Sequence, residues 1–147
     1  LPLVDGQRAL RTVRANAAAW ALDPKRIGIF GCSAGGHLAA TLSTRAAETV
    51  LPAADAIDAV DARPDFAVLL YPVISMAADV THAGSRERLI GPAPSAAAIA
   101  AASLETRVTA ATVAAAGRGG QGGAGEPVRP PRQSFCGPAV TPPRAVR

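Results

Sequence analysis

One short stretch of this chain has residue types and spacing that could do chemistry. The residues Gly31-Cys32-Ser33-Ala34-Gly35 fit the pattern G-x-S-x-G, and Gly36 follows directly. Such a pattern builds a sharp turn between a strand and a helix, which lifts the serine hydroxyl clear of the backbone. Glycines at 31 and 35 avoid a collision across the bend, and Gly36 lets the helix lie close to the sheet. The stretch therefore indicates nucleophilic chemistry at Ser33.

The helix that begins at this serine supplies a second chemical group. Its first backbone N–H groups have no partner within the helix, and the positive end of the helix dipole points at the turn. An oxyanion formed on Ser33 would lie there, so we expect the N–H group of Ala34 to donate to it.

The elements around this turn follow from the hydrophobic pattern. We predict a helix capped by Asp5, with an apolar stripe of Leu10, Val13, Ala17 and Trp20, that ends at 22–24. We then predict buried strands at 27–30 and 66–71, a helix at 34–47 between them, a loop at 75–94 and a helix from Ser95 to Ala102. Two apolar strands joined through a helix predict a parallel pair with a right-handed crossover, which is an α/β fold.

The same residues resemble a known family. The stretches "DPKRIGIFGCSAGGHLAATLSTR", "PDFAVLLYPVISM" and "THAGSRERLIG" are similar to alpha/beta-hydrolase esterases, in particular the acetyl-esterase and acetylxylan-esterase branch. The resemblance covers about residues 1–110 and implies a partial alpha/beta-hydrolase domain. It implies that Ser33 is the nucleophile and that the Ala34 N–H is an oxyanion donor. It also implies that Gly31, Gly35 and Gly36 shape the strand-to-helix turn at Ser33, called the elbow below.

Several parts of the family pattern do not occur in this sequence. The resemblance implies a His-Gly-Gly-Gly loop upstream, and an acid and a base after residue 110, but no Asp or His follows His82. Residues 111–147 consist of Gly, Pro, Ala and Arg at 25 of 37 positions, which predicts disorder. We expect this chain to be a fragment, since it begins at Leu1-Pro2 without Met. We also expect its tail to be a frameshifted reading of a GC-rich gene. A family-like Asp and His in another reading frame would support this, and frames closed by stop codons would contradict it.

Other side chains near the serine are weaker candidates. His37 lies four residues after Ser33, and we expect it to pack the elbow. His82 is expected to make a structural hydrogen bond, although a makeshift triad of Ser33, His82 and Asp79 is conceivable. Cys32 is a possible thiol base or rival nucleophile, but we expect it to point into the core as a small buried hydrophobe.

Charged and glycine-rich clusters elsewhere do not predict a metal or phosphate site. Asp55, Asp58 and Asp61 are three residues apart, which suits a solvated helical face better than a calcium loop. Arg86, Glu87 and Arg88 are expected to be surface charge, with an internal ion pair as the alternative. Gly119 to Gly125 lack the Lys-Ser/Thr of a phosphate loop. We therefore expect no metal and no cofactor.

Charge and hydropathy limit the kinds of partner. The net charge is +4, but the residues up to Ala110 carry ten basic and ten acidic side chains, so the excess belongs to the tail. This argues against a patterned nucleic-acid surface. No apolar run is long enough for a membrane span, and the sequence decides neither the compartment nor the oligomeric state.

The resemblance implies serine-dependent hydrolysis of a carboxylic ester with a short acyl group, such as an acetyl group on a sugar or a small alcohol. A serine peptidase of the prolyl-oligopeptidase type shares the elbow and is one alternative. A non-catalytic remnant is the other, and we expect the chain by itself to be inactive.

Overall fold

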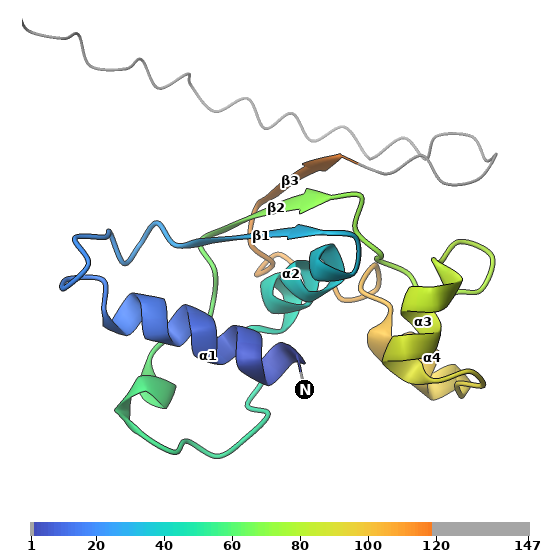
Figure 1. Cartoon of the computed structure of the whole chain (residues 1–147), viewed down its shortest axis with the longest axis horizontal. Coiled ribbons are helices and arrows are strands. Elements are labelled where there is room, and N and C mark those ends of the chain that lie inside the picture. Colours follow the sequence, from blue (N-terminus) through green and yellow to red (C-terminus); the bar gives the residue numbers. More distant parts are fainter. Residues whose placement is uncertain (1, 119–147) are drawn as a thin grey trace, which may run out of the picture.

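A three-stranded parallel sheet carries the helices on one of its faces (Figure 1). The structure is a computed structural model that describes residues 2–118. Its helices are α1 (Pro2–Ala15), α2 (Ser33–Arg45), α3 (Ala83–Ile90) and α4 (Ala96–Ala102), with a short 3₁₀ helix η1 (Ala56–Ala59). Its strands are β1 (Gly28–Cys32), β2 (Phe66–Leu70) and β3 (Ala115–Arg118), in the order β1-β2-β3.

The predicted parallel pair is confirmed. Gly28 pairs with Phe66 and Cys32 with Leu70, and α2 connects the two strands and packs against both. The start of the pair is held by Asp65, whose carboxylate accepts hydrogen bonds from the Ile27 N–H at 2.8 Å and from Arg14 at 3.0 Å. Both strands therefore enter the sheet from one fixed point and end on the same side, where Ser33 lies.

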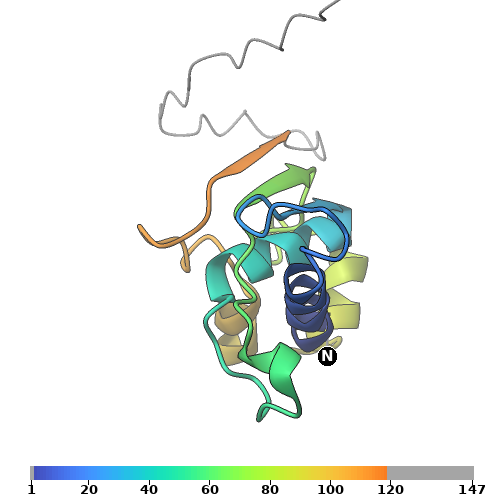
Figure 2. The ribbon, with the colours of Figure 1, turned by 90° about the vertical axis from the view of Figure 1, so that its left-hand side faces the viewer.

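The core lies between α1, α2 and the sheet. Leu10, Ile27 and Leu42 form its centre, and Leu42 is fully buried. Figure 2 shows α1 and α2 on the same side of the sheet. On the opposite face, within residues 2–118, the side chains of Phe30 and Phe66 are 63% and 47% exposed.

The first helix is shorter than predicted. It ends at Ala15, and a turn follows in which the Leu22 N–H bonds to the Ala17 carbonyl and Ala21 has a φ of 53°. Both the backbone N–H and the side-chain amide of Asn16 donate to the Thr12 carbonyl, and the next N–H, that of Ala17, bonds to the Arg14 carbonyl and leaves the α-helical pattern. As a result Trp20 is 53% exposed and does not join the apolar stripe. Asp5 lies inside the first turn and is not the cap.

The loop predicted at 75–94 contains the helix α3. The His82 side chain caps its start by accepting from the Ser85 N–H, and Gly91, with a φ of 87°, ends it. Two glycines and two prolines near this short helix suggested a loop, whereas the capping side chain decided the outcome. The helix predicted after Ser95 is confirmed, because the Ser95 hydroxyl accepts from the Ala98 N–H.

The structured part extends beyond the boundary expected at residue 110. Ala115–Arg118 form β3, which pairs in parallel with β2, so the expectation of disorder from 111 is wrong for these four residues. A strand adds to a sheet edge through backbone groups, and here an added Cβ at Gly117 would collide with the Leu69 carbonyl. The small residues Ala115 to Gly117 therefore fit against this edge of the sheet, although their types do not predict a strand. The expectations for residues 119–147 lie outside the described range.

Candidate active site

The elbow at Ser33 has the geometry that the sequence predicts. Ser33 directly follows β1 and begins α2, with a φ of 50°. A non-glycine residue in this left-handed region is strained by about 1–3 kcal/mol. Such strain persists only where the surrounding structure enforces it. The serine is thus held at the carboxyl end of the parallel strands, where ligands bind in open α/β sheets.

Two of the three elbow glycines are required by close contacts. A Cβ at Gly31 would collide with the Gly35 carbonyl, and a Cβ at Gly36 would lie 2.8 Å from Cβ of Pro72. These contacts agree with the reasons given for Gly31 and Gly36. At Gly35 an added Cβ would meet no atom within 4 Å outside the backbone of its own helix. The expected collision at Gly35 is therefore not present.

The start of α2 has open hydrogen-bond donors. The residue before the helix is Cys32, which makes no side-chain capping bond, and no acidic residue lies in the first turn. The N–H groups of the first turn are therefore available to a negatively charged oxygen, and the helix dipole favours it there. The assignment of the Ala34 N–H as oxyanion donor stays a prediction that fits this geometry.

Val73 ties the elbow to the segment after β2. Its N–H donates to the Ser33 carbonyl at 3.2 Å, and its carbonyl lies 2.8 Å from Nδ1 of His37. Because a carbonyl oxygen can only accept, Nδ1 carries the proton and Nε2 of the neutral ring is the acceptor. Burial lowers the pKa of His37, which keeps the ring neutral. The expectation that His37 packs the elbow agrees with these contacts, whereas the sequence offered no signal for the role of Val73.

The remaining triad candidates are engaged elsewhere or exposed. Nδ1 of His82 accepts from the Ser85 N–H at 3.2 Å and lies 3.0 Å from the Ser85 hydroxyl, so His82 has the structural role expected of it. Asp79 is exposed. Within residues 2–118, no hydrogen bond joins the Ser33 hydroxyl to His37, His82 or Asp79. The described structure therefore does not show Ser33, His82 and Asp79 as a hydrogen-bonded catalytic triad.

Cys32 and the aspartate cluster also differ from expectation. Cys32 is half-buried and does not lie in the core. Asp55 and Asp58 bind Arg8 at 2.7 and 2.9 Å and join η1 to α1. Asp55 and Asp61 are exposed as expected, but only Asp58 lies within a helix, so the three do not share a helical face. The hydrogen bonds from Arg8 lower the pKa of Asp55 to about 2. Over residues 2–118, no group of three or more His, Cys, Asp or Glu side chains could hold a metal ion.

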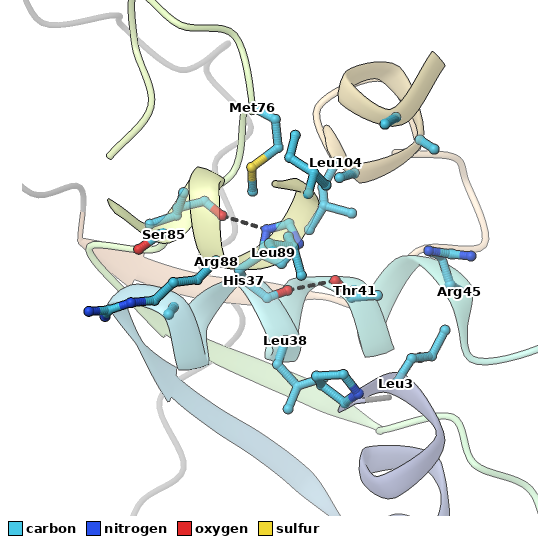
Figure 3. A pocket seen from close by; sticks show the side chains of 17 residues that line it. Leu3, His37, Leu38, Thr41, Arg45, Met76, Ser85, Arg88, Leu89 and Leu104 are labelled. Atoms are coloured by element: carbon cyan, nitrogen blue, oxygen red, sulfur yellow. Dashed lines mark hydrogen bonds between the residues drawn. The ribbon is translucent and has the colours of Figure 1, made fainter. Parts of the chain in front are cut away.

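A cavity of about 590 Å³ lies beside the first turns of α2 (Figure 3). Its wall includes Ala34 and His37 from α2, and Leu89 from α3. Met76 and Leu104 close it, and both are buried. Sequence reasoning missed this cavity, because its wall comes from segments as far apart in the chain as Pro2 and Leu104.

The fold and the elbow together define an α/β protein of the hydrolase class. The sequence profile of an alpha/beta hydrolase fold family matches residues 2–118, and the chain belongs to that family. None of the helices in the matched range combines the length and the hydrophobicity that crossing a bilayer requires.

Known relatives are esterases and xylan-degrading enzymes. An acetylxylan esterase of Xylanibacter ruminicola is 37% identical over 91 residues, which are 62% of this chain and 16% of that protein. Endo-1,4-beta-xylanase B of Butyrivibrio fibrisolvens is 36% identical over 107 residues, which are 73% of this chain and 16% of that protein. The chain thus spans about one sixth of the length of these curated relatives.

Solved structures show the same likeness. An acetyl ester-xyloside bifunctional hydrolase from Caldicellulosiruptor lactoaceticus is 38% identical with a TM-score of 0.70, covering 77% of this chain and 41% of that one. Esterase 2 of Thermogutta terrifontis, in a structure phosphonylated by sarin, is 26% identical with a TM-score of 0.59, over 77% of this chain and 41% of that one. The comparisons give no support for the peptidase alternative.

Proposed function

We propose that this chain carries the nucleophile half of a serine-dependent carboxylic ester hydrolase. The observation that carries the proposal is Ser33, held at a φ of 50° between the strand β1 and a helix whose first N–H groups have no capping side chain. The names of the relatives favour short acyl groups, including acetyl groups on carbohydrate.

The reaction follows from the groups at the elbow. Oγ of Ser33 attacks the ester carbonyl carbon, a base takes the hydroxyl proton, and the carbonyl electron pair moves to its oxygen. The Ala34 N–H donates to that oxyanion. Collapse breaks the bond to the alcohol oxygen, which takes the proton from the base and leaves. Water then releases the acid from the acyl-serine by the same steps in reverse.

The base is not supplied at Ser33 by the described part of this chain. The sequence has only two histidines. Within residues 2–118, neither His37 nor His82 makes a hydrogen bond to the Ser33 hydroxyl, and His82 caps α3. We therefore expect the 147-residue chain to hydrolyse esters poorly. The non-catalytic remnant stays as the second candidate, favoured by the same lack of a hydrogen-bonded base at Ser33.

The test compares Ser33→Ala with the parent sequence in two contexts. In a version that restores the family's loop, acid and base, Ser33→Ala is expected to lower hydrolysis of p-nitrophenyl acetate about 10⁴-fold, because it removes the covalent step. The 147-residue chain is expected to show no multiple turnover. Cys32→Ala is the control, and it should leave the restored activity in place. Near-parental turnover of Ser33→Ala would rule out the nucleophile.

A second measurement reports on the serine directly. A structural relative is phosphonylated by an organophosphorus agent, so a fluorophosphonate probe is a suitable reagent for the restored version. Mass spectrometry is expected to find the label on Ser33 and none on Ser33→Ala. Robust Ser33-dependent turnover by the 147-residue chain would overturn the expectation of inactivity and make His82 and Asp79 the leading base and orienting residue.

A further inference from the structure

The segment that leaves the sheet after β2 is strained beside the strained serine. Tyr71 follows the last residue of β2 and has a φ of 35°, and Ser33 follows the last residue of β1 with a φ of 50°. The last residues of the two strands, Cys32 and Leu70, are paired, so both strained residues lie at the same end of neighbouring strands. Non-glycine residues keep such a conformation only where surrounding contacts enforce it. The contacts between the two turns therefore decide how Ser33 is held.

Val73 uses both of its backbone polar groups to join this segment to α2. Its N–H donates to the Ser33 carbonyl at 3.2 Å, and its carbonyl accepts from Nδ1 of His37 at 2.8 Å, a bond drawn at the His37 ring in Figure 3. One residue earlier, Pro72 packs against Gly36, where an added Cβ would lie 2.8 Å from Cβ of Pro72. The first and the fifth residue of α2 are thus tied to a single residue of the neighbouring segment.

The bond from His37 is important because Val73 is buried. Val73 is 9% exposed, and no second donor to its carbonyl is found within residues 2–118. A buried carbonyl without a partner is unfavourable, so Val73 is expected to move toward water when the His37 donor is removed. The Val73 N–H would then move away from the Ser33 carbonyl. The turn at Ser33 would lose one of the contacts that enforce its strain.

We propose that His37 is a positioning residue for Ser33. Its Nδ1–H holds the carbonyl of Val73, and the Val73 N–H in turn holds the carbonyl of Ser33. This relay keeps the serine hydroxyl in the direction from which it attacks an ester, and His37 itself touches no reacting atom. The inference rests on the proposed function for its link to catalysis. A displacement of about 1 Å at a reacting group can lower the rate about 10²-fold, so the relay is expected to affect turnover.

The unmodified 147-residue chain gives the first test, because the relay requires a particular tautomer. Nδ1 of His37 carries the proton, whereas Nδ1 of His82 accepts from the Ser85 N–H and is unprotonated. Long-range ¹H–¹⁵N NMR of the imidazole rings at about pH 8 is expected to show the Nδ1–H form for His37 and the Nε2–H form for His82. The variant His82→Gln assigns the signals. An Nε2–H form of His37 would overturn the proposal.

Variants of His37 test whether its bond reaches the elbow. His37→Phe keeps an aromatic ring without a donor, whereas His37→Asn has an amide N–H₂ group as many bonds from Cα as Nδ1. We expect His37→Phe to speed hydrogen exchange of the Val73 amide about tenfold or more, and His37→Asn to restore most of the protection. Thr44→Val is the control, because the Thr44 hydroxyl bonds within α2, to the Ala40 carbonyl.

Turnover separates a positioning role from a merely structural one. In the restored version with p-nitrophenyl acetate, His37→Phe is expected to lower kcat about 10–100-fold while KM stays within about threefold. His37→Asn is expected to recover most of the lost kcat, and Thr44→Val to leave it unchanged. His37→Leu is a second variant without a donor and serves if far-UV circular dichroism shows that His37→Phe is not folded.

Each measurement has an outcome that contradicts the relay. Unchanged exchange of the Val73 amide, or unchanged kcat, in a folded variant without the donor would refute it. Equal loss of kcat in His37→Phe and His37→Asn would also refute it, because His37 would then act as the base. The tautomer measurement needs no variant of His37 and decides the matter if neither variant without a donor folds. Failure of the proposed function is seen separately, as equal turnover by the restored version and its Ser33→Ala form.

Discussion

At the residue scale, Ser33 is strained, and the strain can be measured. Glycine adopts the φ of 50° found at Ser33 without steric cost, whereas alanine has a Cβ, which is the source of the backbone strain. We expect Ser33→Gly to raise the free energy of unfolding by about 1 kcal/mol relative to Ser33→Ala. Urea unfolding followed by circular dichroism provides the comparison. Equal stability of the two variants would mean that the elbow is not strained.

His37 gives a prediction about pH. Burial lowers its pKa below the ordinary value of about 6.5, so the unfolded chain binds a proton more readily than the folded one. The stability that neutral His37 contributes is complete above pH 6.5 and is lost as the pH falls below it. We expect the unfolding midpoint in urea to decrease between pH 7 and 5, and to do so less in His37→Gln. The carboxylates Glu48, Asp55 and Asp58 have lowered pKa values and respond only at more acidic pH. An identical pH dependence of the two proteins would contradict the assignment.

At the element scale, the packing of α2 on the segment after β2 depends on Gly36. A Cβ there would lie 2.8 Å from Pro72, so Gly36→Ala must push the helix away and is expected to destabilise the fold by about 1–3 kcal/mol. Gly35→Ala is the matched control one residue earlier. Its Cβ meets open space, and we expect it to stabilise the helix by about 0.5–1 kcal/mol. Thermal and urea unfolding of the two variants check the difference, and the opposite order would show that α2 does not pack as described.

At the scale of the whole molecule, the sheet face opposite α1 and α2 leaves large apolar side chains exposed. Phe30 and Phe66 are exposed there, and β-strand alternation places Val68 and Leu70 on the same face. An apolar patch of this kind favours association. We expect the 147-residue chain to self-associate at micromolar concentration and the double variant Phe30→Lys, Phe66→Lys to do so much less. Sedimentation velocity measures this. Val80→Lys, at an exposed position outside the sheet, is the control, and equal effects of both changes would contradict the prediction.

The residue pattern along the sequence predicted those elements that depend on interactions between residues close together in the chain. The strand at β1, the turn at Ser33, the crossover helix and the parallel pair all followed from an apolar run, two glycines and an amphipathic stretch. The cap at Ser95 was predicted for the same reason, because a capping bond reaches only three residues. These features are encoded within about twenty residues of sequence and need no distant partner.

The sequence by itself thus determined the fold class, the family resemblance and Ser33 as candidate nucleophile. Tertiary structure decided what distant residues do to one another. It paired β3 with the edge of β2 and formed the cavity beside α2. It also buried His37, which keeps the ring neutral, and placed its Nδ1 against the carbonyl of Val73, 36 residues away. Composition and spacing cannot reveal these contacts, because each arises from backbone groups or side chains that meet only after the chain has folded.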